Sequence, residues 1–273
     1  MSVGRRCGER SRPVSPTSRA TPLGDALAEF ASLDRVLIAS DYDGCVSPIV
    51  SRPEDAVPDP ASAAALAAAA ELPNTWAALV SGRARADLAA LSGLGEPVTL
   101  VGSHGAEFES GFDEPLTDEK RALLASIVTE FESIAARLPG TSIETKPVST
   151  TLHVRNASDD DARAALALAV EGPASWNGVH VTHGKAVIEL AVIETSKGHA
   201  LDRLRDRVHA QAVLYLGDDI TDEKAFAHLN LPGDVSVKVG DGATAAKFRI
   251  ADTDEVAQVL AAVVDLRAGF ARP

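Results

Sequence analysis

The chain has only two cysteines, Cys7 and Cys45, among its 273 residues. Two cysteines so far apart do not suggest a disulfide scaffold of the kind that small secreted proteins often need. No run of about 18 or more apolar residues occurs, which argues against a transmembrane helix. The first 22 residues also lack the apolar core of a secretory signal. We therefore expect a cytoplasmic protein that has no membrane partner.

Basic side chains are also scarce, because 26 Lys and Arg stand against 39 Asp and Glu, for a net charge of −13. Residues 1–22 are the exception and read as a disordered basic leader, whose charge of +4 leaves −17 for the remaining chain. A body this acidic repels phosphate backbones, and an aromatic content of 4% leaves few rings for stacking on bases. We expect no nucleic-acid partner, and any site for an anion must be built locally from a metal and a few cations.

Short apolar runs that end abruptly in polar residues are typical of buried parallel strands. Ala/Leu-rich patterns typical of helices, such as residues 61–72 and 197–210, fill most of the gaps between them. This alternation predicts an α/β fold with a Rossmann-like parallel sheet that is covered on both faces. The predicted strands are residues 35–40, 76–80, 98–101, 212–216 and 235–239. The polar residues that follow four of them are Asp41, Ser81, Ser103 and Asp218, and such strand ends line the ligand crevice of open α/β sheets.

The middle of the chain breaks this alternation. An amphipathic helix is predicted over residues 117–138, and three aspartates suit the start of a second helix over 160–170. Alternating patterns between and after these helices predict paired strands, including a hairpin around His183-Gly184-Lys185. These strands are residues 142–146, 150–155, 179–182 and 186–192. We therefore predict a smaller α+β cap domain, 114–193, inserted in a core domain made of 23–113 and 194–273.

Asp41 and Asp43 follow the first predicted strand, in the run Asp41-Tyr42-Asp43-Gly44. One carboxylate can attack phosphorus while the other moves a proton at the leaving oxygen. Two carboxylates beside a phosphate dianion would repel it, so a divalent cation is expected, and oxygen ligands suit Mg²⁺. The run by itself is equally compatible with a polar turn or a helix cap.

A second acidic group follows the strand at 212–216, in the run Gly217-Asp218-Asp219-Ile220-Thr221-Asp222-Glu223. Asp218 is placed to complete the metal shell, while Asp219 and Asp222 can hold metal-bound waters or orient cations. A helix N-cap would need Thr221 or Asp222 alone and would not require two aspartates before it. The two acidic groups together therefore favour a metal site.

Phosphate oxygens also need hydrogen-bond donors. Ser81-Gly82-Arg83 can offer a hydroxyl and the backbone N–H groups of a helix start. Lys197 opens a later helix and can place a point charge near both the nucleophile and the phosphate. Either motif alone is common in loops, but the order of acid pair, serine, lysine and acidic cluster predicts a phosphoryl-transfer site.

This order resembles the haloacid dehalogenase-type phosphatase superfamily and, more narrowly, the trehalose-6-phosphate phosphatase family. The resemblance covers about residues 34–265 and includes three further stretches. These are Gly102-Ser103-His104-Gly105-Ala106-Glu107, Leu152-His153-Val154-Arg155 and Gly184-Lys185-Ala186-Val187-Ile188-Glu189. The resemblance implies a hydrolase of trehalose biosynthesis, which releases phosphate from the small-molecule sugar phosphate trehalose 6-phosphate.

The resemblance also implies roles for individual residues. Asp41 would be the nucleophile, and Asp43 the general acid and later the base. Mg²⁺ would lie on Asp41, the carbonyl of Asp43 and Asp218, while Lys197 and Ser81 would hold the phosphoryl group. The other substrate contacts would come from the core and from a cap that closes over the sugar. They are Gly82, Arg83, His104, Glu107, Arg155, Lys185 and Glu189.

Some of these assignments have alternatives. Lys185 and Glu189 can face one side of the cap sheet, where they either bind sugar or form an exposed ion pair. Arg155 either contacts substrate or braces the cap sheet. We expect the protein to be a monomer.

Three positions depart from the family pattern. Cys45 stands where Thr is usual, Val154 stands where an aromatic residue is common, and Leu190-Ala191-Val192 stands where a basic residue and Pro usually follow Glu189. The cap therefore lacks one cation, which leaves another glycosyl phosphate, such as sucrose or glucosylglycerol phosphate, as an alternative substrate. A non-catalytic sugar-phosphate sensor is the other alternative.

Overall fold

The computed structural model describes residues 22–112, 114–184, 186–194 and 196–270. The predicted basic leader lies outside these residues except for Pro22, as does Lys185. No helix among the described residues is long and apolar enough to cross a membrane.

A six-stranded sheet forms the core, with every neighbouring pair of strands parallel and in the order β12-β11-β10-β1-β2-β3. All five residues of the central strand β1 are buried, because both faces of the sheet are covered. The five predicted strands are confirmed, and β12 is an addition. The strands are β1 (Val36–Ser40), β2 (Thr75–Val80), β3 (Thr99–Val101), β10 (Ala212–Gly217), β11 (Val235–Val239) and β12 (Phe248–Ile250).

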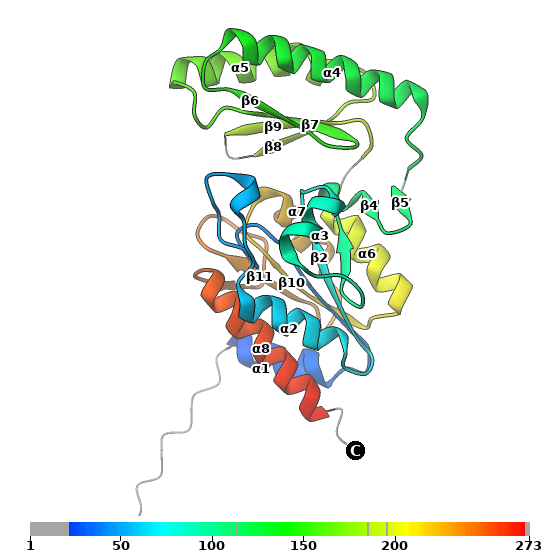
Figure 1. Ribbon diagram of the computed structural model, residues 1–273. Coiled ribbons are helices and arrows are strands. Elements are labelled where there is room, and N and C mark those ends of the chain that lie inside the picture. The colour runs from blue at the N-terminus through cyan, green and yellow to red at the C-terminus, as the bar shows by residue number, and fades with distance from the viewer. Residues whose placement is uncertain (1–21, 113, 185, 195, 271–273) are drawn as a thin grey trace, which may run out of the picture.

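Helices cover the two faces of this sheet (Figure 1). Ile38 of β1 packs in one apolar cluster with α1, α2, α3 and α8, while Leu37 and Ala39 pack in a second cluster with α6 and α7. Successive residues of a strand point to opposite faces, so one strand contributes to both clusters. The helices are α1 (Pro22–Ser32), α2 (Pro60–Ala70), α3 (Arg85–Ser92), α6 (Lys197–Val208), α7 (Ile220–His228) and α8 (Thr253–Phe270).

The inserted segment forms a separate antiparallel sheet of order β6-β7-β9-β8 with two helices on one face. Phe131 of α4 packs against Leu152 and Ile188 of this sheet in an apolar cluster of its own. The predicted order of helix, two strands, helix and two strands is confirmed, with ends displaced by a few residues. The elements are α4 (Asp118–Arg137), β6 (Ser142–Thr145), β7 (Ser149–His153), α5 (Asp159–Glu171), β8 (His180–Gly184) and β9 (Val187–Ala191).

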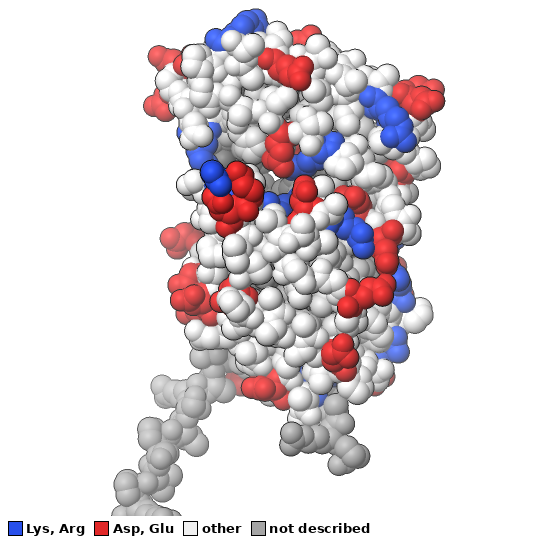
Figure 2. Space-filling model, viewed as in Figure 1, with Lys and Arg blue, Asp and Glu red and all other residues white. Residues whose placement is uncertain are grey.

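The chain leaves the core through a small hairpin of β4 (Glu107–Phe108) and β5 (Gly111–Phe112). The sheet face of the cap that carries no helices points toward the core (Figure 1). In Figure 2 the molecular surface is hollowed between the two parts, and side chains of both charge signs line the hollow. The structure thus forms a polar cleft between the cap and the core.

Candidate active site

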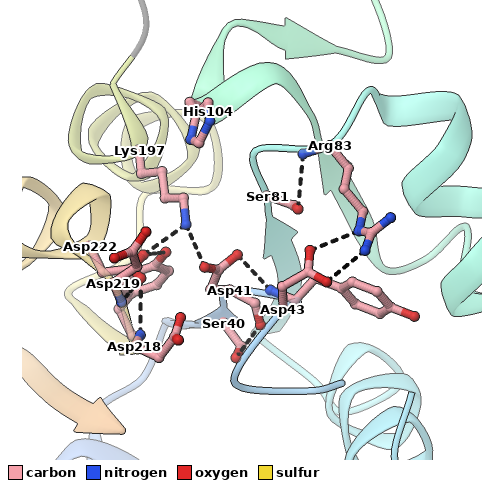
Figure 3. Close-up of polar contacts among 12 residues, drawn as sticks. Ser40, Asp41, Asp43, Ser81, Arg83, His104, Lys197, Asp218, Asp219 and Asp222 are labelled. Carbon is pink, nitrogen blue, oxygen red and sulfur yellow. Dashed lines mark hydrogen bonds and ion pairs between the residues drawn. The ribbon is translucent and has the colours of Figure 1, made fainter. Parts of the chain in front are cut away.

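The loops that follow the core strands bring the predicted residues together at one edge of the sheet (Figure 3). Asp41 follows β1, Ser81 follows β2, Ser103 and His104 follow β3, and Asp218 follows β10. The strands are parallel, so their carboxyl ends meet at the same edge. Residues that are far apart in the sequence therefore face a common space.

Asp41 is buried, with 5% of its surface exposed. Its Oδ2 accepts a hydrogen bond from the Lys197 amine at 2.6 Å, and its Oδ1 accepts one from the Tyr42 N–H at 2.7 Å. Burial raises the pKa of Asp41 well above its ordinary value, and the positive charge of Lys197 opposes this rise. Lys197 is thus the side chain that favours the charged form of Asp41, which the predicted role as a nucleophile requires.

Lys197 lies between two carboxylates, those of Asp41 and Asp222 (Figure 3). Burial alone would lower its pKa, but Asp222 and Asp41 outweigh burial and raise it above the ordinary value. The amine therefore stays protonated while it is almost entirely enclosed. A buried cation held in this way can face a phosphoryl oxygen without losing its charge.

Asp222 has hydrogen bonds to both of its carboxylate oxygens. Oδ1 accepts from the Lys197 amine at 2.9 Å and from the Tyr215 hydroxyl at 2.7 Å. Oδ2 accepts from the backbone N–H groups of Asp218 and Asp219, each at 3.0 Å. Burial raises the pKa of Asp222, but Lys197 and these donors outweigh burial and bring it below the ordinary value. Asp222 therefore orients Lys197 and shapes the loop that carries Asp218.

The carboxylates of Asp41, Asp218 and Asp222 form the candidate metal site, with one oxygen of each within 4.8 Å of the others. Oxygens of this kind suit a hard cation such as Mg²⁺. Burial and the neighbouring Asp222 raise the pKa of Asp218 to about 7, a repulsion that a bound cation would relieve. Four donors already occupy the two oxygens of Asp222. The residues that can turn an oxygen toward a cation are therefore Asp41 and Asp218.

Gly44 makes room for Asp218. Its φ is +77°, and a Cβ built there would lie 2.1 Å from Asp218 Oδ2. Only a residue without a side chain fits this approach in a left-handed conformation. The carboxylate of Asp43 lies outside the group of three, and its predicted metal contact through the backbone carbonyl remains a prediction.

The carboxylate of Asp43 is instead held by Arg83. Arg83 Nε donates to Asp43 Oδ2 and a terminal guanidinium nitrogen donates to Oδ1, both at 2.7 Å. The Arg83 N–H donates to the hydroxyl of the fully buried Ser81 at 3.2 Å. Gly82 lies between them, where a Cβ would come within 2.4 Å of the His104 ring. The predicted phosphate-binding turn therefore also holds the predicted general acid.

His104 and Glu189 connect the core to the cap. His104 Nε2 lies 3.0 Å from Glu189 Oε2, which also accepts from the Lys146 amine at 3.2 Å. The Ser149 hydroxyl donates to the other oxygen at 2.7 Å. Burial raises the pKa of Glu189, but His104, Lys146 and Ser149 outweigh burial and bring it well below the ordinary value. Sequence reasoning missed Lys146 and Ser149, although the alternating polar residues Ser149, Thr151 and His153 indicate one polar face.

Glu107 has a contact that the sequence did not suggest. Its Oε2 accepts from the Arg85 N–H at 2.8 Å, at the start of α3, and from the Ser103 hydroxyl at 3.3 Å. Ser103 and His104 both have positive φ, at 51° and 53°, so Glu107 holds a strained loop that carries His104. Its predicted role in substrate binding remains a prediction. Arg155 is exposed after β7, and both of its alternatives stay open.

The chain is similar in sequence to known trehalose-phosphate phosphatases. The family model described as trehalose-phosphatase matches residues 39–254. The chain is 31% identical over 221 residues to the trehalose-6-phosphate phosphatase of Escherichia coli (strain K12), which covers 79% of this chain and 82% of that protein. It is 34% identical over 236 residues to a bifunctional trehalose-6-phosphate synthase/phosphatase of Thermoproteus tenax. That match covers 82% of this chain but only 31% of the bifunctional protein, so the chain spans less than a third of that relative.

The fold has a close counterpart among solved structures. The C-terminal domain of the C. albicans trehalose-6-phosphate phosphatase superimposes with a TM-score of 0.78 and 25% sequence identity. The superposition covers 90% of this chain and 97% of that one, so it includes both the core and the inserted cap. The chain therefore belongs to the trehalose-phosphatase family.

Proposed function

We propose that the protein hydrolyses trehalose 6-phosphate to trehalose and phosphate through a phosphoryl group carried on Asp41. The main support is the buried carboxylate of Asp41, whose Oδ2 lies 2.6 Å from the Lys197 amine. The carboxylate of Asp218 lies beside it. Enclosing three charged groups in this way lowers the stability of the fold, and such clusters are typical of sites that act on a charged substrate. Membership of the family supports the sugar, because the Escherichia coli relative carries that substrate in its name.

A divalent cation fits the site. Asp41 and Asp218 would hold Mg²⁺, which when bound supplies the positive charge that offsets the phosphate and carboxylate charges. Burial and the neighbouring Asp222 raise the pKa of Asp218 to about 7, and a bound cation would oppose both effects. The chemistry of the donor set is thus consistent with the cation that the sequence predicts.

Asp41, Asp43 and Lys197 have separate tasks in the two half-reactions. An Asp41 oxygen attacks phosphorus, and the bond from phosphorus to the sugar oxygen breaks as the Asp43 carboxyl group donates its proton to that oxygen. In the second step the Asp43 carboxylate takes a proton from water, the water oxygen attacks phosphorus, and Asp41 is restored as phosphate leaves. Lys197 faces the phosphoryl oxygens and offsets their charge throughout.

Arg83 adds a condition to this sequence of steps. Both oxygens of Asp43 accept hydrogen bonds from Arg83, so this pair restrains the direction in which Asp43 points. A phosphate dianion offers Arg83 an alternative bidentate partner. We expect the arriving substrate to draw Arg83 away and free Asp43 at the moment when it is needed.

A panel of sugar phosphates at equal concentration tests the substrate. Phosphate release from trehalose 6-phosphate should exceed release from sucrose 6-phosphate and glucosylglycerol phosphate by about tenfold or more. EDTA should abolish release and Mg²⁺ should restore it. A faster rate on another member of the panel would identify that sugar instead, and no release from any member would favour the sensor.

The Asp41→Asn variant tests the chemistry. It should show no turnover while its circular dichroism matches that of the unmodified protein. The same change at exposed Asp206 serves as the control and should leave turnover unchanged. Full activity of Asp41→Asn would refute the nucleophile.

The cytoplasmic location and the monomeric state stay proposals drawn from the sequence. Cell fractionation tests the first and sedimentation velocity tests the second.

A further inference from the structure

Thr151 carries a buried hydroxyl that the fold leaves unpaired. The residue lies on β7 with 2% of its surface exposed, and its Oγ1 has no hydrogen-bond partner among the described residues. Buried hydroxyls in proteins are almost always paired, because an unpaired one loses its bonds to water and gains nothing in return. An exception of this kind leaves room for a partner from outside the chain.

The sheet register places this hydroxyl on the face of the cap sheet that is turned toward the core. Thr151 lies opposite Glu189 in the pairing of β7 with β9, so the two side chains share one face of the cap sheet. Ser149, two residues before Thr151, donates to Glu189 and lies on that face as well. Leu152 points the other way, into the apolar cluster under the cap helices. The face that holds Thr151 is therefore the one that meets His104 of the core.

The carboxylate of Glu189, which lies opposite Thr151, already has its donors. The oxygens of Glu189 accept from Ser149, Lys146 and His104, and no hydrogen bond joins Glu189 to Thr151. A threonine hydroxyl both donates and accepts. A sugar hydroxyl has the same dual character, whereas the phosphate end of the substrate is bound by the core residues.

We propose that Thr151 is a specificity-determining residue, whose Oγ1 hydrogen-bonds a hydroxyl of the sugar. This inference rests on the proposed function, since it assigns a contact within that same cleft. Without substrate, the unpaired hydroxyl of Thr151 lowers the free energy of unfolding. A bound sugar would supply the missing hydrogen-bond partner.

The Thr151→Val variant tests the contact, because valine keeps the shape and removes the hydroxyl. We expect kcat/KM for trehalose 6-phosphate to fall about three- to tenfold, mainly through KM, as for the loss of one neutral hydrogen bond. The kcat/KM for p-nitrophenyl phosphate, which has no sugar, should not change. The thermal midpoint should stay the same or rise, and Thr151→Ser should restore the kinetics.

Thr150→Val is the matched control on the same strand. The Thr150 hydroxyl is also buried but donates to the Glu144 carbonyl at 3.2 Å. Its loss should lower the thermal midpoint and leave the ratio of kcat/KM between the two substrates unchanged. Equal losses on both substrates for Thr151→Val, or no loss on either, would overturn the inference.

The two proposals can fail separately. If the unmodified protein does not hydrolyse trehalose 6-phosphate, the proposed function is refuted and this inference with it. If the unmodified protein is active and Thr151→Val is equally active, only the inference is refuted.

Discussion

Asp222 is fully buried and has no direct access to a substrate, yet it connects the parts of the site. It receives the Lys197 amine and the Tyr215 hydroxyl on one oxygen and two backbone N–H groups on the other. A buried charge of this kind is tolerated only when nearly every lone pair is used. The residue thus links the loop after β10 to the first turn of α6.

Replacing Asp222 by Asn should lower the free energy of unfolding by about 3–5 kcal/mol, because Lys197 loses one of its two buried counter-charges. Urea unfolding monitored by circular dichroism measures this change. The same replacement at exposed Asp206 should cost less than about 1 kcal/mol. A loss at Asp222 as small as that of the control would contradict the role given to its carboxylate.

The lowered pKa of Glu189 predicts how the free energy of unfolding depends on pH. Its pKa in the folded chain lies well below the ordinary value of 4.5, so near that pH the unfolded chain binds a proton that the folded chain does not. Its contribution is therefore fully present above about pH 4.5 and is lost as the pH falls further. The stability difference between the unmodified protein and Glu189→Gln should shrink as the pH falls from about 4.5 to about 3.

Urea unfolding across that pH range measures the effect, and Glu132→Gln on the exposed side of α4 is the control. A difference between the unmodified protein and Glu189→Gln that does not vary with pH would show that Glu189 is not held in its charged form.

Helix α6 and the turn after β1 show how whole elements place single groups. Lys197 is the first residue of α6, where the helix dipole disfavours a cation. Two carboxylates, Asp41 and Asp222, offset that cost. Leu201 and Leu204 pack the helix against the core sheet, so the position of Lys197 is set by the whole helix.

The turn at Gly44 gives a sharper test at this scale. Gly44→Ala adds a Cβ that would lie 2.1 Å from Asp218 Oδ2, and the displaced carboxylate should lower kcat by about a hundredfold. Gly93→Ala is the matched control, because Gly93 also has positive φ but has nothing within 4 Å of the added Cβ. Both variants should lose about 1–2 kcal/mol of stability through backbone strain. Equal activity of the two variants would mean that Asp218 does not depend on the turn.

At the scale of the whole molecule, the cap and the core are joined by a polar contact across the cleft and by a small apolar cluster of Ala106, Val148 and Ile193. The cap has its own apolar cluster, and the core has two others. The contact between His104 and Glu189 crosses the cleft that separates them. This contact can open without exposing any of these three larger clusters, so the cap is suited to move as a unit.

His104→Ala should therefore loosen the cap. Without its contact to Glu189, we expect small-angle scattering to give a larger radius of gyration than for the unmodified protein. His180→Ala, on an exposed position of β8, is the control and should leave the profile unchanged. Identical profiles for both variants would show that this contact does not hold the cap in place.

The sequence by itself determined the fold class, the order of elements in the cap and the identity of the acidic groups. Apolar runs of five residues, such as Val36–Ser40, have the length and composition that strands buried on both faces require. The strand Phe248–Ile250 escaped prediction because the charged Arg249 interrupts it, so it forms no continuous apolar run. The carboxyl ends of parallel strands meet at one edge whatever the details of packing, so Asp41, Ser81 and Asp218 could be brought together without coordinates.

Only the tertiary structure decided which of these groups touch. The pairs Asp43 with Arg83, Lys197 with Asp222 and His104 with Glu189 join residues 25 to 85 positions apart. Hydrogen bonds depend on distances of a few tenths of an ångström, which strand patterns and helix patterns do not contain. The period of the strand assigns Thr150 and Thr151 to opposite faces of the cap sheet. Only the structure shows that the hydroxyl of Thr150 reaches an acceptor and that of Thr151 does not, because this depends on the position of the neighbouring chain.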